Sequence, residues 1–102
     1  MSKVCIIAKI TANEGMRSDM VAAMGSMIDH VEANEPGTIR YILMEDASDE
    51  NVVWFYEEYV DHDALAAHGS SEAMKAMGGA LRGFAAGRPE ITILNPVRGK
   101  GL

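Results

Sequence analysis

The segment VVWFYEEY, which ends at Tyr59, constrains the fold of this chain more than any other part of the sequence. Its β-branched and aromatic residues are typical of a β-strand. Successive side chains of a strand point to opposite faces of the sheet, which places Trp54 and Tyr56 on one face. Phe55, Glu57 and Tyr59 then point to the opposite face. Both faces of the predicted sheet are therefore bulky, and both need to be covered.

The periodicity of apolar residues predicts a β-α-β-β-α-β order in a single domain that spans residues 1–102. Two β-α-β halves folded together give an α+β, ferredoxin-like fold, βαββαβ, with a four-stranded antiparallel sheet and both helices on one face. The tail at 98–102 is expected to be frayed. We expect strands at residues 4–12, 38–45, 52–59 and 90–97, a helix that starts at residue 16 and is ended by residues 34–37, and a helix from residue 62 that is interrupted at 69–71 and then continues.

Helices on one face of a sheet leave its other face bare. An exposed aromatic sheet face of this size normally marks an interface. The simplest cover is a second copy of the chain, packed sheet to sheet with two-fold symmetry. We therefore predict a homodimer with Trp54 and Tyr56 at its interface. The sequence leaves open which strand face meets the partner, because both faces are apolar.

The charge and the cysteine content of the chain limit the kinds of partner and the cellular compartment that we expect for it. The net charge is -6 and the nine basic residues are scattered, which disfavours nucleic acid and anionic membranes as partners. Cys5, the single cysteine, lies in an apolar run, so we expect a buried hydrophobic residue rather than a nucleophile. It has no partner for an internal disulfide, and its apolar run is too short for a signal peptide or membrane span. We therefore expect a cytoplasmic protein.

His68 is the main candidate for chemistry in the sequence. It follows Leu65 by three residues, so the two share the inward face of the predicted helix. Glu57, near the end of the preceding strand, could pair with this imidazole and make it a base at neutral pH. A buried histidine bonded to a backbone carbonyl would have the same spacing. The spacing alone does not decide between these two interpretations.

The remaining polar residues of this region are predicted to be a solvated surface. His62 and His68 are six residues apart, which puts them on different faces of a helix. We therefore expect no metal site there. Glu58, His62 and Asp63 are expected to face solvent.

Two stretches of the sequence resemble the antibiotic biosynthesis monooxygenase family. EPGTIRY looks like the family's Gly-x-Leu-x-Tyr strand entry, carried here by Gly37, Ile39 and Tyr41. FYEEYVDHDALAAHGSS looks like its pattern of Glu-x-aromatic, then Asp, then Ala-Leu, then His followed by Ser. The residues that match the second pattern are Glu57, Tyr59, Asp61, Ala64, Leu65, His68 and Ser71.

The resemblance implies a dimeric α/β barrel with a pocket between the sheet and the helices of each subunit. It implies a cofactor-independent monooxygenase that oxidises a quinol or a polycyclic phenol, a small aromatic substrate, without flavin, haem or metal. His68 would be the base and Glu57 the group that orients it. The implied substrate-binding residues are Tyr41, Tyr59, Leu65 and Phe55.

The chain also departs from the family pattern. Many members carry Pro-His soon after the serine, where this chain has Glu72 and Ala73, so a second pocket histidine is missing. Haem cleavage is disfavoured, because Ala8 and His68 stand where haem-degrading members place asparagine and tryptophan. Two alternatives remain: a non-catalytic dimeric small-molecule-binding protein, or an isomerase of this family acting on a phosphorylated signalling compound. For a phosphorylated substrate, Arg40 is the only basic residue inside the signature.

Overall fold

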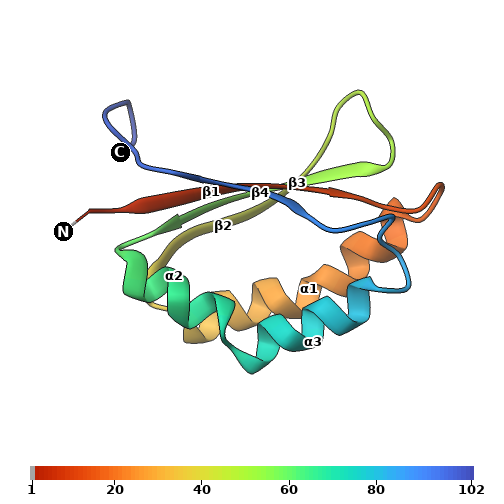
Figure 1. Ribbon diagram of the computed structural model, residues 1–102, viewed down its shortest axis with the longest axis horizontal. Helices are drawn as coiled ribbons and strands as arrows, with labels where there is room; N and C mark the ends of the chain where they lie inside the picture. Colours follow the sequence, from red (N-terminus) through yellow and green to blue (C-terminus); the bar gives the residue numbers. More distant parts are fainter. Residues whose placement is uncertain (1) are drawn as a thin grey trace.

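The computed structural model describes residues 2–102 and shows a sheet with helices packed on one of its faces (Figure 1). The strands lie in the order β2-β3-β1-β4, and all neighbouring strands are antiparallel. The predicted α+β, ferredoxin-like fold is therefore confirmed. The elements along the chain are β1 (Val4–Thr11), α1 (Arg17–Asn34), β2 (Thr38–Glu45), β3 (Val52–Tyr59), α2 (His62–Gly69), α3 (Glu72–Leu81) and β4 (Glu90–Leu94).

The helical segment after β3 is divided into two short helices, each with a side-chain cap. Asp61 caps α2 by accepting a hydrogen bond from the Ala64 N–H at 2.8 Å. Ser71 caps α3 in the same way through the Met74 N–H at 3.1 Å. The predicted interruption near residue 70 is therefore where the second cap forms. Of the helices in residues 2–102, none has the length and the apolar character needed to cross a membrane.

β4 is shorter than the predicted strand, which was expected to reach Val97. It ends at Leu94, which pairs with Cys5 on β1. β1 itself begins only one residue before that pair, at Val4. Pro96 has no N–H group and cannot donate to a sheet ladder. β4 therefore ends at Leu94, because β1 extends only one residue beyond that pair and Pro96 has no N–H group to donate.

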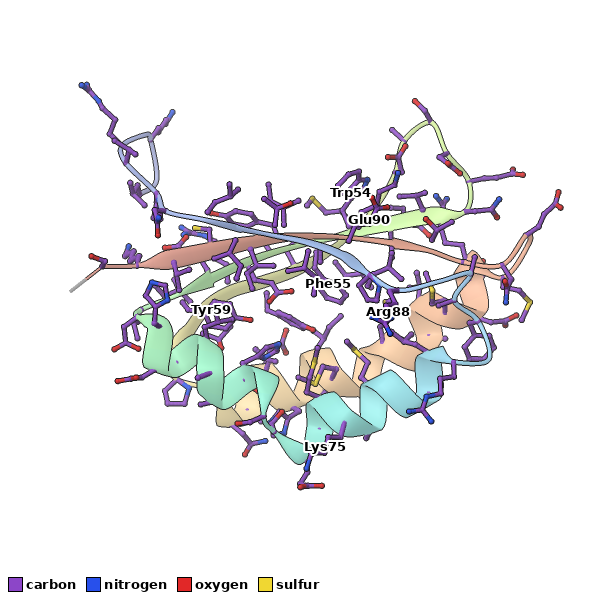
Figure 2. The ribbon with its side chains drawn as sticks, in the orientation of Figure 1. Trp54, Phe55, Tyr59, Lys75, Arg88 and Glu90 are labelled. Carbon is purple, nitrogen blue, oxygen red and sulfur yellow. The ribbon has the colours of Figure 1, made fainter. Side chains whose placement is uncertain are left out.

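The sheet face toward the helices forms the core. Phe55 and Tyr59 of β3 point from the sheet toward the helices, as Figure 2 shows, and both are buried. α1 meets them with side chains at intervals of three and four residues, the spacing of one helix face. The buried residues of α1 are Met20, Met24, Met27 and Val31. The methionines are therefore mainly core residues.

The opposite face of the sheet carries no helix (Figure 1). Trp54 points to this side, away from the helices, in Figure 2. Several apolar side chains on this face are exposed, including Ile42 at 45% and Met44 at 44%. We call this surface the outer sheet face. Its members, from the strand register, include Cys5, Ile7, Lys9, Ile42, Met44, Trp54, Tyr56 and Leu94.

The expectation that Glu58 faces solvent is wrong. Its side chain is 1% exposed and forms ion pairs with Lys3, at 3.3 Å, and with Arg40. Burial acts to raise the pKa of Glu58, but the bonds from Arg40 and Lys3 outweigh this effect and lower the pKa. Arg40 also donates to the carbonyl of Gly101 at 3.3 Å, which joins the tail to β2. Two cations therefore keep this buried carboxylate ionised.

Candidate active site

α2 presents one histidine to the interior and another to solvent. His68 lies in the last turn of α2, and its side chain is only 3% exposed. Leu65, three residues earlier, packs against the same core. His62, in the first turn of the helix, is exposed. The helix that Asp61 caps therefore turns His68 inward, toward the end of the sheet.

The imidazole of His68 bonds to a carboxylate that the sequence analysis did not single out. Its Nδ1 lies 2.8 Å from Oε1 of Glu35, and its Nε2 lies 3.9 Å from Oε1 of Glu57. The second distance is too long for a hydrogen bond. Within residues 2–102, Nε2 has no hydrogen-bond partner. His68 thus bonds to a carboxylate rather than a backbone carbonyl, and Glu57 is the more distant of the two carboxylates.

Glu57 lies on the core side of His68 and accepts a hydrogen bond from the Tyr59 hydroxyl. Burial raises the pKa of Glu57, and the Tyr59 bond and the neighbouring His68 offset this only in part. Burial and the nearby Glu57 also raise the pKa of Tyr59. For Tyr41 the same two causes, with Glu35 as a third, raise the pKa. The two phenols therefore keep their protons at neutral pH.

Aromatic rings surround His68 on its core side. The ring centroids of Tyr41 and Tyr59 lie 5.1 Å and 5.4 Å from that of the imidazole. Tyr41 stacks on Phe55 with the centroids 4.7 Å apart. Leu65 packs against the hydrophobic core. Of the four predicted substrate-binding residues, Tyr41, Tyr59 and Phe55 thus lie beside or behind His68, and all four are packed side chains.

The cavity beside His68 lies near the ends of the helices rather than between the sheet and the helices. Its volume is about 360 Å³, and it opens between the end of α1, the α1–β2 connection and α2. Among the residues that the sequence proposed for the site, only His68 borders this cavity. The polar residues that line it are His30, Asn34, Glu35, Thr38, His68 and Ser71.

Glu35 is held by groups from the end of α1 and the start of β2. The Thr38 hydroxyl donates to Oε1 at 2.9 Å, and Nε2 of His30 lies 3.3 Å from Oε2. The side-chain amide of Asn34 lies 3.3 Å from the other ring nitrogen of His30. Glu35 and His30 are the site residues that sequence reasoning missed. The expectation that the pocket lacks a second histidine is wrong, because His30 borders the cavity together with His68. The available signal was an acidic residue directly before Pro36, at a turn that leads into a strand.

The residues of the site can carry out proton chemistry. Across residues 2–102 no group of three or more His, Cys, Asp or Glu side chains is placed to hold a metal ion. An imidazole that bonds to a carboxylate, as His68 does to Glu35, is a common acid–base group in proteins. The fold and the site together define a ferredoxin-like α+β protein with a buried histidine–carboxylate pair at the wall of a cavity.

The sequence comparison extends this description to a family. The antibiotic biosynthesis monooxygenase family matches residues 3–79, which is more than half of the chain. The chain therefore belongs to the antibiotic biosynthesis monooxygenase family. A search of the curated proteins gives no match.

Solved structures share the fold over nearly the whole chain. A proposed antibiotic biosynthesis monooxygenase from Caulobacter crescentus is 29% identical, with a TM-score of 0.90 over 95% of this chain and 92% of that chain. Rv0793 from Mycobacterium tuberculosis is 25% identical, with a TM-score of 0.87 over 98% and 100% of the two chains. SnoaB, a cofactor-independent oxygenase from Streptomyces nogalater, is 17% identical, with a TM-score of 0.84 over 100% of both chains. At that identity, the likeness to SnoaB shows the fold alone.

Proposed function

We propose that this protein is a cofactor-independent monooxygenase that oxidises a quinol or a polycyclic phenol. One observation carries the proposal: in a chain of this family, a buried histidine held by a carboxylate borders a cavity. Such a pair is the acid–base equipment that the reaction needs. SnoaB, which has the same fold, is described as a cofactor-independent oxygenase.

In this reaction the substrate itself supplies the electrons that reduce dioxygen. Loss of the phenolic proton gives an anion whose ring is electron-rich and transfers electrons to dioxygen. One oxygen atom stays on a ring carbon, which becomes a carbonyl. The other oxygen leaves as water with the hydrogens that the hydroxyl and that ring carbon lose. The protein has to bind the flat ring, accept the proton and stabilise the anion.

We assign the base to His68, with Glu35 orienting the ring through its bond to Nδ1 and Glu57 lying beside Nε2. A proton on the imidazole would lie between Glu35, 2.8 Å from Nδ1, and Glu57, 3.9 Å from Nε2. This arrangement supports the uptake of a phenolic proton without a metal.

The size of the cavity supports a small, flat substrate. Its volume of about 360 Å³ is near the lower end of the roughly 300–1,000 Å³ that is usual for small-molecule sites. A quinol with few rings therefore suits it better than a large polycyclic phenol. Tyr41 and Leu65 are half-buried but do not border the cavity, so they are proposed to support the site by packing rather than by touching the substrate. Phe55 and Tyr59 are fully buried and are proposed to act by packing behind His68.

We further propose that the functional form is a homodimer, a dimeric α/β barrel in which two outer sheet faces meet. The exposed apolar side chains of that face, together with Trp54 and Tyr56, support this proposal. We also propose that the protein works in the cytoplasm. The free, buried thiol of Cys5 suits a reducing compartment.

Oxygen uptake measured across a panel of quinols and phenols tests the proposed function. In His68→Ala we expect turnover to fall by roughly 10²–10⁴-fold, which is the usual contribution of a positioned acid or base. His62→Ala removes the exposed histidine of the same helix and should leave turnover as in the wild type.

Three outcomes would overturn parts of this proposal. Full turnover in His68→Ala would remove His68 from the mechanism. Quinol binding by the wild-type protein without oxygen uptake would favour a non-catalytic binding protein. Turnover of a phosphorylated compound in the absence of oxygen would favour the isomerase.

A further inference from the structure

The edge strand β4 is largely exposed even on the side of the sheet that faces the helices. Ile91 and Ile93 pair with Ala8 and Ile6 of β1, whose side chains belong to the core. Paired residues point to the same side of a sheet, so Ile91 and Ile93 also face the helix side. They are nevertheless 57% and 59% exposed. They form an exposed apolar strip along a strand whose neighbour is fully packed on the same side.

A cavity of about 320 Å³ lies at the start of this strip, between the end of α3 and the residues that lead into β4. Ile10, Leu81 and Pro89 contribute to its apolar lining. Pro89 lies two residues before Ile91, which joins the cavity to the strip. This cavity shares no lining residue with the cavity beside His68. We call the cavity and the strip of Ile91 and Ile93 together the β4 groove.

Two arginines border the cavity of the β4 groove. Arg82 and Arg88 are exposed, and the ion pairs of lysine and arginine within residues 2–102 involve other residues. Glu90, the acid nearest in sequence, stands opposite Lys9 of the outer sheet face, so its side chain points away from the cavity. Figure 2 shows Arg88 on the helix side of the sheet and Glu90 on the other side. The apolar groove therefore begins at two positive charges that lack a carboxylate partner.

We propose that the β4 groove binds a linear alkyl carboxylate of medium length, such as a free fatty acid. The carboxylate pairs with Arg82 and Arg88, because a guanidinium and a carboxylate can form two parallel hydrogen bonds. The alkyl chain runs along β4 and covers Ile91 and Ile93. From Pro89 to Ile93 the groove runs for roughly 13 Å, at about 3.3 Å a residue, which is about the length of a ten-carbon chain.

Calorimetric titration of the full chain with fatty acids, below the concentrations at which they form micelles, tests the site. From hexanoate to decanoate, we expect the affinity to rise roughly two- to fourfold for each methylene that the groove buries. Octanol keeps the chain of octanoate without its charge and should bind about tenfold more weakly. The double variant Arg82→Gln, Arg88→Gln should lose that difference. Equal binding of octanoate and octanol by the wild type would overturn the role of the arginines.

A glycine of α3 allows the groove to be blocked. Gly78 borders the cavity, and a Cβ built there meets no neighbouring atom within 4 Å. Gly78→Phe should fold, because phenylalanine favours a helix more than glycine does. Its ring should take the space of several methylenes and weaken decanoate binding at least about fivefold. Gly79→Phe is the matched control, since its Cβ is equally free but does not border the cavity. Wild-type affinity in folded Gly78→Phe would overturn the site.

Light scattering separates this ligand from a second copy of the chain as the occupant of the groove. Ile93→Asp should weaken decanoate binding, because it places a carboxylate beside the alkyl chain. It should leave the oligomeric state of the wild type unchanged, since the proposed dimer uses the outer sheet face. Dissociation of a dimer by this variant would show that the strip is a contact between copies and would overturn the ligand site. The site does not rest on the proposed oxygenase reaction, which oxygen uptake tests separately.

Discussion

The surroundings of the Glu57 side chain favour its protonated, neutral form. Burial raises its pKa, and the bond from Tyr59 and the nearby His68 offset that rise only in part. In the unfolded chain the pKa of this group is about 4.5. Below that pH both states hold the proton. Above it the unfolded chain releases the proton more readily, so the stability that Glu57 contributes is lost as pH rises through its folded pKa.

Replacing Glu57 with glutamine should therefore stabilise the protein more at high pH than at low pH. Glutamine is neutral and keeps an acceptor for the Tyr59 hydroxyl. The free energy of unfolding of Glu57→Gln, relative to wild type, should increase between about pH 4.5 and about pH 8. Urea unfolding at both values measures the difference. Glu32→Gln, at an exposed position, is the control, and a difference for Glu57→Gln that does not vary with pH would contradict the prediction.

The sequence predicted the orientation of His68 but not its partner. Its inward direction follows from helix geometry, because Leu65 lies three residues earlier on the same face. Glu35 is distant in sequence and reaches the imidazole through the shape of the α1–β2 connection. Glu58 shows the opposite error: its charge suggested a solvated surface, but Arg40 and its neighbours cover it. Contacts between distant elements were beyond the reach of local patterns in both cases.

At the scale of elements, α2 depends on the absence of a side chain at Gly37. A Cβ built there would lie 2.7 Å from the Cβ of Ala64, closer than real Cβ atoms approach each other. Gly37→Ala should therefore push α2 away from the start of β2. We expect it to destabilise the protein by about 1–3 kcal/mol, the usual cost of overpacking. Thermal or urea unfolding measures the loss.

Two further variants make this test specific. Gly25→Ala adds a methyl group inside α1 where no neighbouring atom lies within 4 Å, so it should stabilise the protein by about 0.5–1 kcal/mol. Ala64→Gly, combined with Gly37→Ala, removes the clash, and the pair should be less destabilising than the sum of the single changes. Additive effects would show that the contact does not limit the packing of α2.

The regular elements were predictable because their signals are local. The bounds of β2 and β3 agree with the prediction, since a polar loop separates two clear strand patterns. The interruption between α2 and α3 follows from the capping chemistry of Ser71. The end of β4 was wrong because it depends on where the partner strand β1 begins. Pairing limits of this kind are set by tertiary structure.

At the scale of the whole molecule, the helices decide which sheet face remains free. The sequence did not decide which face this is, because β3 carries apolar side chains on both of its faces. The helices pack against the side of Phe55, and Trp54 lies on the outer sheet face (Figure 2). The Trp54 Nε1–H donates to Asp46 at 2.8 Å, which fixes the ring across that face. The exposed apolar side chains around it, Ile42 and Met44 among them, form the surface on which the proposed homodimer would assemble.

A charge on the outer sheet face should break the proposed dimer. Trp54→Asp would place a carboxylate in a desolvated apolar interface. We expect the dimer dissociation constant to rise at least roughly 30-fold, which corresponds to about 2 kcal/mol for a central interface residue. Ile42→Asp, at a more exposed position on the same face, should act in the same direction with less risk to the fold. Light scattering at micromolar concentration measures the assembly.

Ala22→Asp is the matched control, because Ala22 lies on α1 and is exposed, away from the outer sheet face. This variant should remain dimeric, since its new charge faces solvent in either state. A wild-type protein that is monomeric at micromolar concentration would refute the dimer itself. Folded Trp54→Asp and Ile42→Asp variants that stay dimeric would instead place the interface on another surface. The exposed Ile42 and Met44 side chains would then need a different explanation, because a second copy of the chain would no longer cover them.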